Sequence, residues 1–338
     1  MLGTVAGGTQ YMDPQVGAPR AFFDQVDLDT AEVRRIKVGF LGHGFTQDPT
    51  RLERAALFEK KGPGGATINL STLEVTGSIA ASPGCAFYGH GLFSIDGAKL
   101  FVVEAKLDSL AGRITVRDGQ SLKVLGEVAT FGTAPHDCHL VDGGKTLVVT
   151  NGGGTLDSGD PPSVTFIDLG AGKLLDKLAL TRSHINAGHV ARSDDGALVV
   201  VSAPRAGLPE ESTVGGVSLK PVSGDLVSVE GPTDVMGKLF GESLSVCIHE
   251  PTGIAVVTTP RAGLVTFWNI SERRLVSTFA VKSPRGVTLS RDGSAFVLAC
   301  GLKAELVLLS TETLQVIPSL PYGTALLSGS HAYLVAPH

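Results

Sequence analysis

Short apolar runs bounded by glycine- and aspartate-rich turns recur along most of the chain. Runs such as LFVVEA, LVVTNG and LVVVSA each follow a turn, and hairpins of alternating β-branched and aromatic residues follow in segments 113–128, 163–178 and 264–279. Alternation with a period of two, interrupted by such turns, predicts β-strands. The unit repeats at roughly 40 to 55 residues, which is typical of the four-stranded blades of a β-propeller.

The number of repeats predicts how the ring closes. Six complete units fit between about Val38 and Tyr322, which leaves half a unit at each end. Residues 324–338 are expected to give two inner strands, and residues 21–38 two outer strands, of one further blade. Closure by both termini would remove the open sheet edges that promote aggregation. The sequence therefore predicts an all-β fold, a seven-bladed β-propeller that residues 1–338 form as a single domain.

Composition narrows the function classes. Glycine supplies 43 of the 338 residues and charged residues only 18%, as expected for short strands that are joined by tight turns and buried between neighbouring blades. The net charge of −5, without a basic run, argues against nucleic acid as a partner. No apolar stretch is long enough for a transmembrane segment. The four cysteines lack paired spacing, so we expect buried packing residues rather than disulfides.

Histidine recurs at one position of the repeat. Three copies place a histidine six residues before the aspartate of the turn, and a degenerate earlier copy has a histidine at the matching position; these residues are His43, His90, His136 and His189. Two later copies carry Val246 and Gly286 there. Equivalent positions in successive blades surround the channel axis, so the four rings are expected to meet at one mouth of the channel.

Such an imidazole cluster suits copper, zinc or iron and, with no carboxylate expected nearby, would be cationic. The alternative is that each ring only hydrogen-bonds the backbone of the neighbouring blade.

Other candidates carry weaker signals. His139 and His249 lie three residues past the repeated position, and strand alternation predicts that they are buried between blades. His331 is assigned to the closing strand and His338 to the tail. Arg261 and Arg285 stand near strand ends, where a guanidinium can bind the carboxylate of a ligand or cofactor; the alternative for both is a solvated or ion-paired surface position.

Four sequence strings carry a resemblance to a known family. They are FYGHGLFSIDGAKLFVVEA, the Gly-x-x-Pro-His element that ends at His136, GGKTLVVTNGG and TTPRAGLVTFWN. The chain resembles the bacterial family called domain of unknown function 1513. The resemblance implies a Tat-exported, periplasmic, seven-bladed propeller of YVTN type. Such genes often neighbour those of imelysin-like and di-haem peroxidase-like proteins in apparent iron-uptake clusters, which makes these proteins candidate partners. No biochemical activity follows from the family.

The N-terminus lacks the basic and apolar regions of an export signal, so a periplasmic protein would have lost its leader; the cytoplasm is the alternative.

Together these features predict binding of a transition metal, or of a metal-bearing small ligand, at the channel mouth as an accessory to iron or metal acquisition. Two alternatives stay open. One is a protein-interaction scaffold of the same pathway, and the other is a lactonase-like hydrolase that uses histidine and arginine at the channel mouth. No G-x-S-x-G nucleophile motif is present, so the sequence favours a binding protein over an enzyme.

Overall fold

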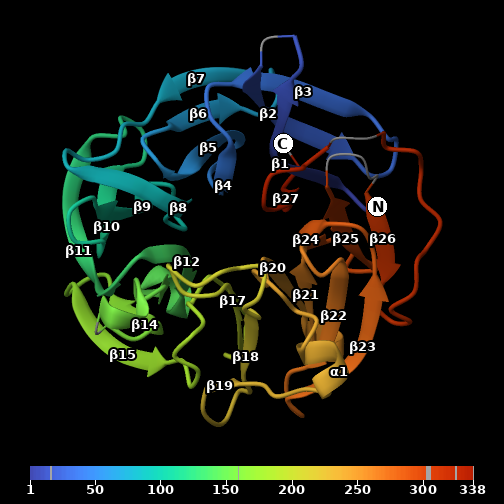
Figure 1. Cartoon of the computed structure of the whole chain (residues 1–338). Helices are drawn as coiled ribbons and strands as arrows, with labels where there is room; N and C mark the ends of the chain where they lie inside the picture. Colours follow the sequence, from blue (N-terminus) through green and yellow to red (C-terminus); the bar gives the residue numbers. More distant parts are fainter. Residues whose placement is uncertain (16, 159, 302–305, 324–325, 338) are drawn as a thin grey trace.

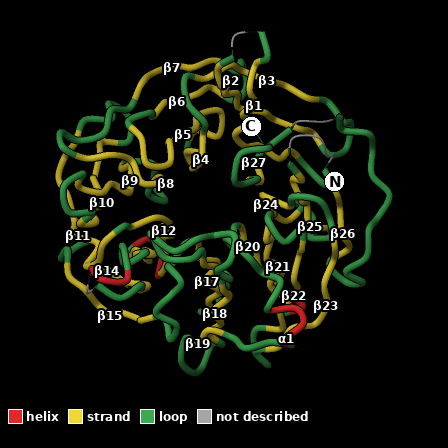
Figure 2. The backbone as a smooth tube through the Cα atoms, in the orientation of Figure 1, coloured by secondary structure: helices red, strands yellow, loops and turns green. Residues whose placement is uncertain are grey.

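A computed structural model describes the whole chain except residues 16, 159, 302–305, 324–325 and 338. Antiparallel sheets surround a common centre, and β4, β8, β12, β20 and β24 lie nearest to it (Figure 1). Figure 2 shows helix only as short turns between strands. The all-β prediction is therefore confirmed. Among the described helices, none has the length and apolar character needed to cross a membrane.

Most strands follow one another along the chain in antiparallel groups of four. The eight strands β4 to β11 form one sheet, because β5 also pairs with β8. The first four of them are β4 (Gly42–Asp48), β5 (Arg51–Gly62), β6 (Gly65–Asn69) and β7 (Glu74–Ser78). The next four are β8 (Cys85–Phe93), β9 (Lys99–Lys106), β10 (Ala111–Asp118) and β11 (Val124–Thr133).

Three further sheets have four strands each, and one has three described strands. One contains β12 (Pro135–Val141), β13 (Thr146–Asn151), β14 (Ser163–Asp168) and β15 (Lys173–Ala179). The next contains β16 (His189–Arg192), β17 (Leu198–Ser202), β18 (Gly216–Lys220) and β19 (Val227–Ser228). A third contains β20 (Ser245–His249), β21 (Ile254–Thr259), β22 (Leu264–Asn269) and β23 (Arg274–Ala280). The sheet with three described strands contains β24 (Pro284–Leu289), β25 (Ala295–Cys300) and β26 (Val307–Ser310). The helical turns are α1 (Thr233–Met236), η1 (Asp142–Gly144), η2 (Leu156–Ser158) and η3 (Glu250–Thr252).

The two ends of the chain meet in one sheet, as the sequence predicts. Its strand order is β27 (Tyr333–Val335), β1 (Thr4–Asp13), β2 (Ala18–Asp27) and β3 (Val33–Val38). The expected division between the ends is wrong in one respect. The second strand comes from residues 4–13, whereas the described part of segment 324–338 contributes only β27; residues 324–325 and 338 lie outside the described residues.

Glycine explains why β1 escapes recognition as a strand. A Cβ on Gly7 would lie 2.5 Å from the carbonyl oxygen of His331, and one on Gly8 would lie 2.1 Å from that of Gly42. These close contacts require glycine at two positions where a strand of the repeat usually carries apolar side chains.

The core lies between neighbouring sheets. Trp268 is fully buried between the sheets that hold β17 and β21, and its indole N–H donates to Thr266 Oγ1 at 2.8 Å. Phe23 of β2 stacks on Phe45 of β4 with 5.5 Å between the ring centroids. Complete burial of each large side chain contributes about 1.5–3 kcal/mol. The packing thus holds the first strand of each sheet in a fixed position around the centre.

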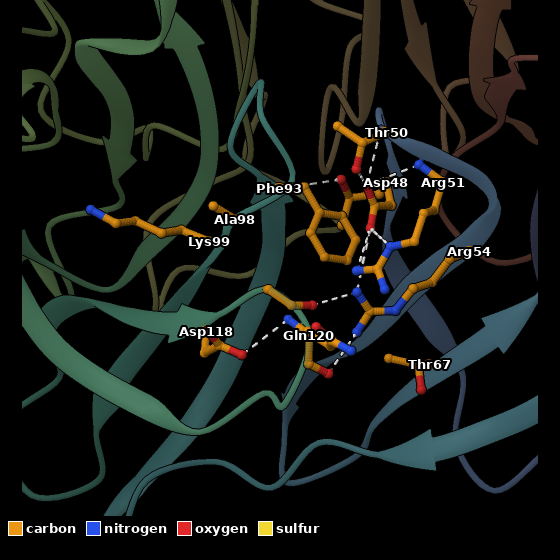
Figure 3. Close-up of polar contacts among 12 residues, drawn as sticks. Asp48, Thr50, Arg51, Arg54, Thr67, Phe93, Ala98, Lys99, Asp118 and Gln120 are labelled. Atoms are coloured by element: carbon orange, nitrogen blue, oxygen red, sulfur yellow. Dashed lines mark hydrogen bonds and ion pairs between the residues drawn. The ribbon is translucent and has the colours of Figure 1, made fainter.

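A buried carboxylate joins the strands that lead to the centre. Asp48, at the end of β4, accepts hydrogen bonds from Arg51 Nε at 3.1 Å and Arg54 Nη1 at 3.3 Å (Figure 3). Arg54 also donates to the carbonyl oxygens of Gly119 and Gln120 in the turn after β10. Burial opposes ionisation of Asp48, but the hydrogen bonds from Thr50 and the charge of Arg51 outweigh it and lower its pKa.

Candidate metal centre

The four histidines of the repeated position converge at the centre of the molecule. They come from the first strands β4, β8, β12 and β16, and all four rings are buried. Three Nε2 atoms form a triangle: His136 to His189 is 2.7 Å, His43 to His136 is 3.2 Å and His43 to His189 is 3.4 Å. The ring of His90 lies 4.9 to 5.2 Å from the other three, centroid to centroid.

Local irregularities in the strands direct these rings inward. The pairing register shifts around His43 in β4, around His90 in β8 and around His136 in β12, so each of these histidines lies at a β-bulge. A bulge bends the strand and turns a side chain away from regular alternation. Gly89 adds the space, because a Cβ there would lie 2.6 Å from the ring of His136, and its φ of +148° suits glycine.

A fifth histidine completes the cluster. The ring of His331, just before β27, lies 4.2 Å from that of His189 and 4.7 Å from that of His43. Gly286 makes room for it, since a Cβ there would meet the backbone nitrogen of Ala332 at 2.3 Å. Sequence reasoning missed His331 because no turn aspartate follows it; the strand beside β27 is β1, from the other end of the chain. The small residues around it, as in the Gly-His pairs at His43 and His90, were the available signal.

Hydrogen bonding fixes the tautomer of His136. Its Nδ1 lies 2.7 Å from the carbonyl oxygen of Tyr88, which can only accept, so Nδ1 carries the proton. In the neutral ring, Nε2 then presents its lone pair to His43 and His189. Three further buried nitrogens in the cluster have no hydrogen-bond partner among the described residues: His43 Nδ1, His90 Nε2 and His331 Nε2. An unsatisfied buried polar group costs about 1–3 kcal/mol, which a bound ion could offset.

The geometry could hold a metal ion. His43, His90, His189 and His331 each offer one nitrogen, and these four atoms lie within 4.8 Å of one another. The Nε2 atom of His136 also lies close to those of His43 and His189, two members of this group of four. The five rings therefore supply more nitrogen ligands than a four-coordinate ion requires.

Burial keeps the cluster neutral. It lowers the pKa of each of the five rings, and for His43, His136, His189 and His331 well below the usual value. The charge of Lys60 lowers all five further, and neighbouring rings lower four of them. Neutral imidazole is the form that binds a metal.

A carboxylate lies beside the cluster, contrary to the sequence expectation. Asp137 is buried, and its Oδ1 lies 3.6 Å from His90 Nδ1. The backbone N–H groups of Cys138 and Val190 donate to it at 2.8 and 3.0 Å. The bulge in β12 explains the difference, because it interrupts the strict alternation that would turn Asp137 away from the face of His136. A carboxylate in this position can orient a ligating histidine.

Asp137 also contacts His139, and the prediction that His139 is buried between blades is wrong. His139 Nε2 lies 3.2 Å from Asp137 Oδ2, and its side chain is 45% exposed. Partial burial opposes protonation of His139, but the Asp137 carboxylate outweighs it and raises the pKa. His249 is buried as expected, with Nδ1 2.8 Å from Thr252 Oγ1 and its ring against Phe296.

Three cavities reach the histidine cluster. One, of about 610 Å³, is lined by His90, His189 and His331 and by residues that follow the histidines in their strands, such as Leu92 and Val190. Another, of about 250 Å³, is lined by His136, His189 and residues that precede them in the chain, such as Ala134 and Gly188. A third, of about 680 Å³, reaches His43. Lys60 lines the second and third cavities.

The two candidate arginines do not join the histidines. The side chain of Arg261 is 52% exposed and lies 4.0 Å from Glu211. Arg285 donates from Nε to the carbonyl oxygen of Gly329. Neither lines any of the three cavities that reach the rings. Their role in binding a ligand or cofactor stays a prediction.

Comparisons with known proteins agree with the fold. The family model described as "Protein of unknown function (DUF1513)" matches residues 36–321. The structure is similar to hydrazine synthase from Kuenenia stuttgartiensis, with a TM-score of 0.68 and 15% identity over 90% of this chain and 95% of that one. It is also similar to the dihydro-heme d1 dehydrogenase NirN in complex with DHE, with a TM-score of 0.64 and 13% identity over 99% of this chain and 75% of that one. At these identities the likeness shows a β-propeller-like fold alone. No curated protein matches the sequence.

Proposed function

This chain belongs to the DUF1513 family, and we propose that it binds one transition-metal ion at the centre of its channel through His43, His90, His136, His189 and His331. One observation carries the proposal: five buried rings, four from separate strands and one from the segment just before β27, bring ring nitrogens close to one another. Packing alone would not require this, because apolar side chains would fill the same space without unsatisfied nitrogens.

The donor set selects the class of metal. Imidazole nitrogen suits zinc, copper or iron, whereas calcium and magnesium require oxygen ligands. His43, His136 and His189 would hold such an ion through their Nε2 atoms, which lie 2.7 to 3.4 Å from one another, and His90 and His331 would supply further imidazole nitrogens.

The finer parts of the proposal rest on the family resemblance and on repeat counting. Counting β4 to β11 as two blades gives a seven-bladed propeller. A periplasmic site, accessory to iron or metal acquisition, would receive the metal as an ion or as a metal-bearing small ligand. Imelysin-like and di-haem peroxidase-like proteins are the candidate partners.

Elemental analysis tests the proposal. We expect untagged protein that is purified and exchanged into buffer without chelators to carry about one ion of copper, zinc or iron per chain. Protein that remains metal-free after incubation with each of the three ions would contradict it. A second copy of the assay with His184→Ala, a loop variant outside the cluster, controls for surface binding.

A lactonase-like hydrolase is the second candidate, favoured by the partly exposed pair of His139 and Asp137 on the wall of the 610 Å³ cavity. The Asp137 carboxylate could orient His139 as a general base. Turnover of a simple lactone by metal-stripped protein, lost in His139→Ala, would support hydrolysis. Equal background rates for both proteins would remove this candidate.

A further inference from the structure

Lys60 occupies an unusual position beside the histidine cluster. It lies near the end of β5 and pairs with Tyr88 of β8, the residue whose carbonyl oxygen holds His136. Its side chain lines the 250 Å³ cavity together with His136 and His189, and the 680 Å³ cavity together with His43. Lys60 therefore borders the histidine layer from the side opposite to Asp137 and His139.

The ammonium group of Lys60 lacks a hydrogen-bond or ion-pair partner within the described part of the chain. Burial lowers its pKa, and the charge of Glu242 opposes this shift without a direct contact. The neighbouring cations are engaged: Lys61 lies 5.5 Å from the Tyr88 ring centroid, and Arg285 donates to Gly329. Lys60 is thus a cation held beside the rings without a counter-charge in contact.

A divalent metal ion bound by the five rings would lack a compensating negative charge near Lys60. Five neutral imidazoles do not offset the charge of the ion, and the Lys60 ammonium adds a further positive charge beside the rings. Asp137 offsets part of the charge from the far side, beside His90. The lining of the 680 Å³ cavity also contains Lys37, Glu59 and Arg20, whose guanidinium is ion-paired with Asp13. An anion in this cavity would meet the charges of Lys60 and Lys37 together with the metal.

We propose that the site binds its metal together with a carboxylate co-ligand, which enters from the 680 Å³ cavity, coordinates the ion and pairs with Lys60. This inference rests on the proposed metal-binding function and names the ligand that completes it. The carboxylate could be a free small acid or one arm of a chelate that delivers the metal, and the same chemistry recognises both. Charge-assisted hydrogen bonds from an ammonium to a carboxylate are among the stronger polar contacts.

The test uses Co²⁺ as a spectroscopic probe of the full-length protein. Co²⁺ is titrated in chloride buffer, with sodium formate and with sodium citrate at matched ionic strength. For the wild type we expect formate to change the visible absorption of bound Co²⁺ and to tighten its binding by about tenfold. In Lys60→Gln the formate effect should vanish, while Co²⁺ without formate binds at least as tightly, because the repelling charge is gone.

Lys61→Gln is the matched control, since this neighbour lies over Tyr88, and it should retain the formate effect. Lys60→Arg should restore part of it. A response to formate identifies a free carboxylate as sufficient, and a response to citrate alone identifies the arm of a chelate; either supports the inference. If neither anion changes Co²⁺ binding, or if the anions change it equally in the wild type and in Lys60→Gln, the carboxylate co-ligand is overturned and the metal site is not. Absence of Co²⁺ binding in every protein overturns the metal site itself and this inference with it.

Discussion

Contacts with single neighbouring groups orient the buried histidine rings at the centre. His136 has its tautomer set by one backbone carbonyl, and its Nε2 lone pair faces two neighbours. His90 lies against a buried carboxylate, and His331 lies 3.4 Å through Nδ1 from Ser245 Oγ. These outer contacts orient the rings before any ligand arrives. The five rings are therefore held in defined orientations by the surrounding protein.

The lowered histidine pKa values predict the pH dependence of stability in the metal-free protein. The unfolded chain binds protons as pH falls below about 6.5, whereas the buried rings of the folded chain resist protonation. The unfolding free energy should therefore fall as pH decreases from 7.5 to 5.5. Thermal unfolding of EDTA-treated protein across this range measures it. The variant His189→Asn should show a smaller dependence, and a melting temperature that rises toward pH 5.5 in the wild type would oppose the argument.

Thiol reactivity should separate two cysteines. Cys300 is buried and burial raises its pKa to about 12, so almost no thiolate exists at pH 8. Cys85 is half-buried and its pKa is raised without a comparable enclosure. We expect a short iodoacetamide pulse, read by peptide mass spectrometry, to label Cys85 well before Cys300 in native protein. Equal labelling of both before unfolding would contradict the packing.

Residues at bulges mark the limit of sequence reasoning at this scale. The repeat alignment finds His43, His90, His136 and His189 because they share a distance to a turn. Asp137 and His139 are misjudged because alternation was counted through a bulge that only the pairing register reveals. Lys60 carries no sequence signal at all, since its place at the centre depends on the contact between β5 and β8.

Elements are held in register by a few polar contacts as well as by apolar packing. The strand β4 carries His43 at one end and Asp48 at the other. Asp48 binds Arg54, and Arg54 reaches the turn between β10 and β11 in the neighbouring group of strands (Figure 3). The strand that carries the His43 imidazole is thus anchored at its other end by the ion pair between Asp48 and Arg54.

Asp48→Ala should weaken this coupling. The change removes the acceptor of Arg51 and Arg54, and we expect a loss of about 2 kcal/mol in unfolding free energy. Urea unfolding of the variant and of Asp108→Ala, an exposed aspartate with a local contact to Ser109, measures the difference. Equal stability of the two variants would mean that the buried network contributes nothing measurable.

At the scale of the whole molecule, contacts between first strands follow the ring. Neighbouring first strands touch from β4 through β8, β12, β16, β20 and β24 to β27, and β1 then contacts β4. Repeat counting predicted that strands from both termini share one sheet, as the pairing of β27 with β1 shows. It could not predict that β1 supplies the second strand, because Gly7 and Gly8 replace the apolar run.

Removal of residues 324–338 tests the closure. The truncated chain loses β27 and exposes the edge of β1, and it also loses His331 from the cluster. We expect a lower and less cooperative thermal transition. The full-length variant His331→Ala separates the two losses, since it should keep a cooperative transition. An unchanged melting curve for the truncated protein would refute the closure.

Isothermal titration with Zn²⁺ of the wild type, His136→Ala and the loop control His184→Ala tests the metal centre. We expect saturable binding near one ion per chain in the wild type and in His184→Ala. In His136→Ala we expect the affinity for Zn²⁺ to weaken by at least about tenfold, or about 1.4 kcal/mol. No saturable binding by the wild type, or the same affinity in all three proteins, would contradict a metal centre built from these histidines.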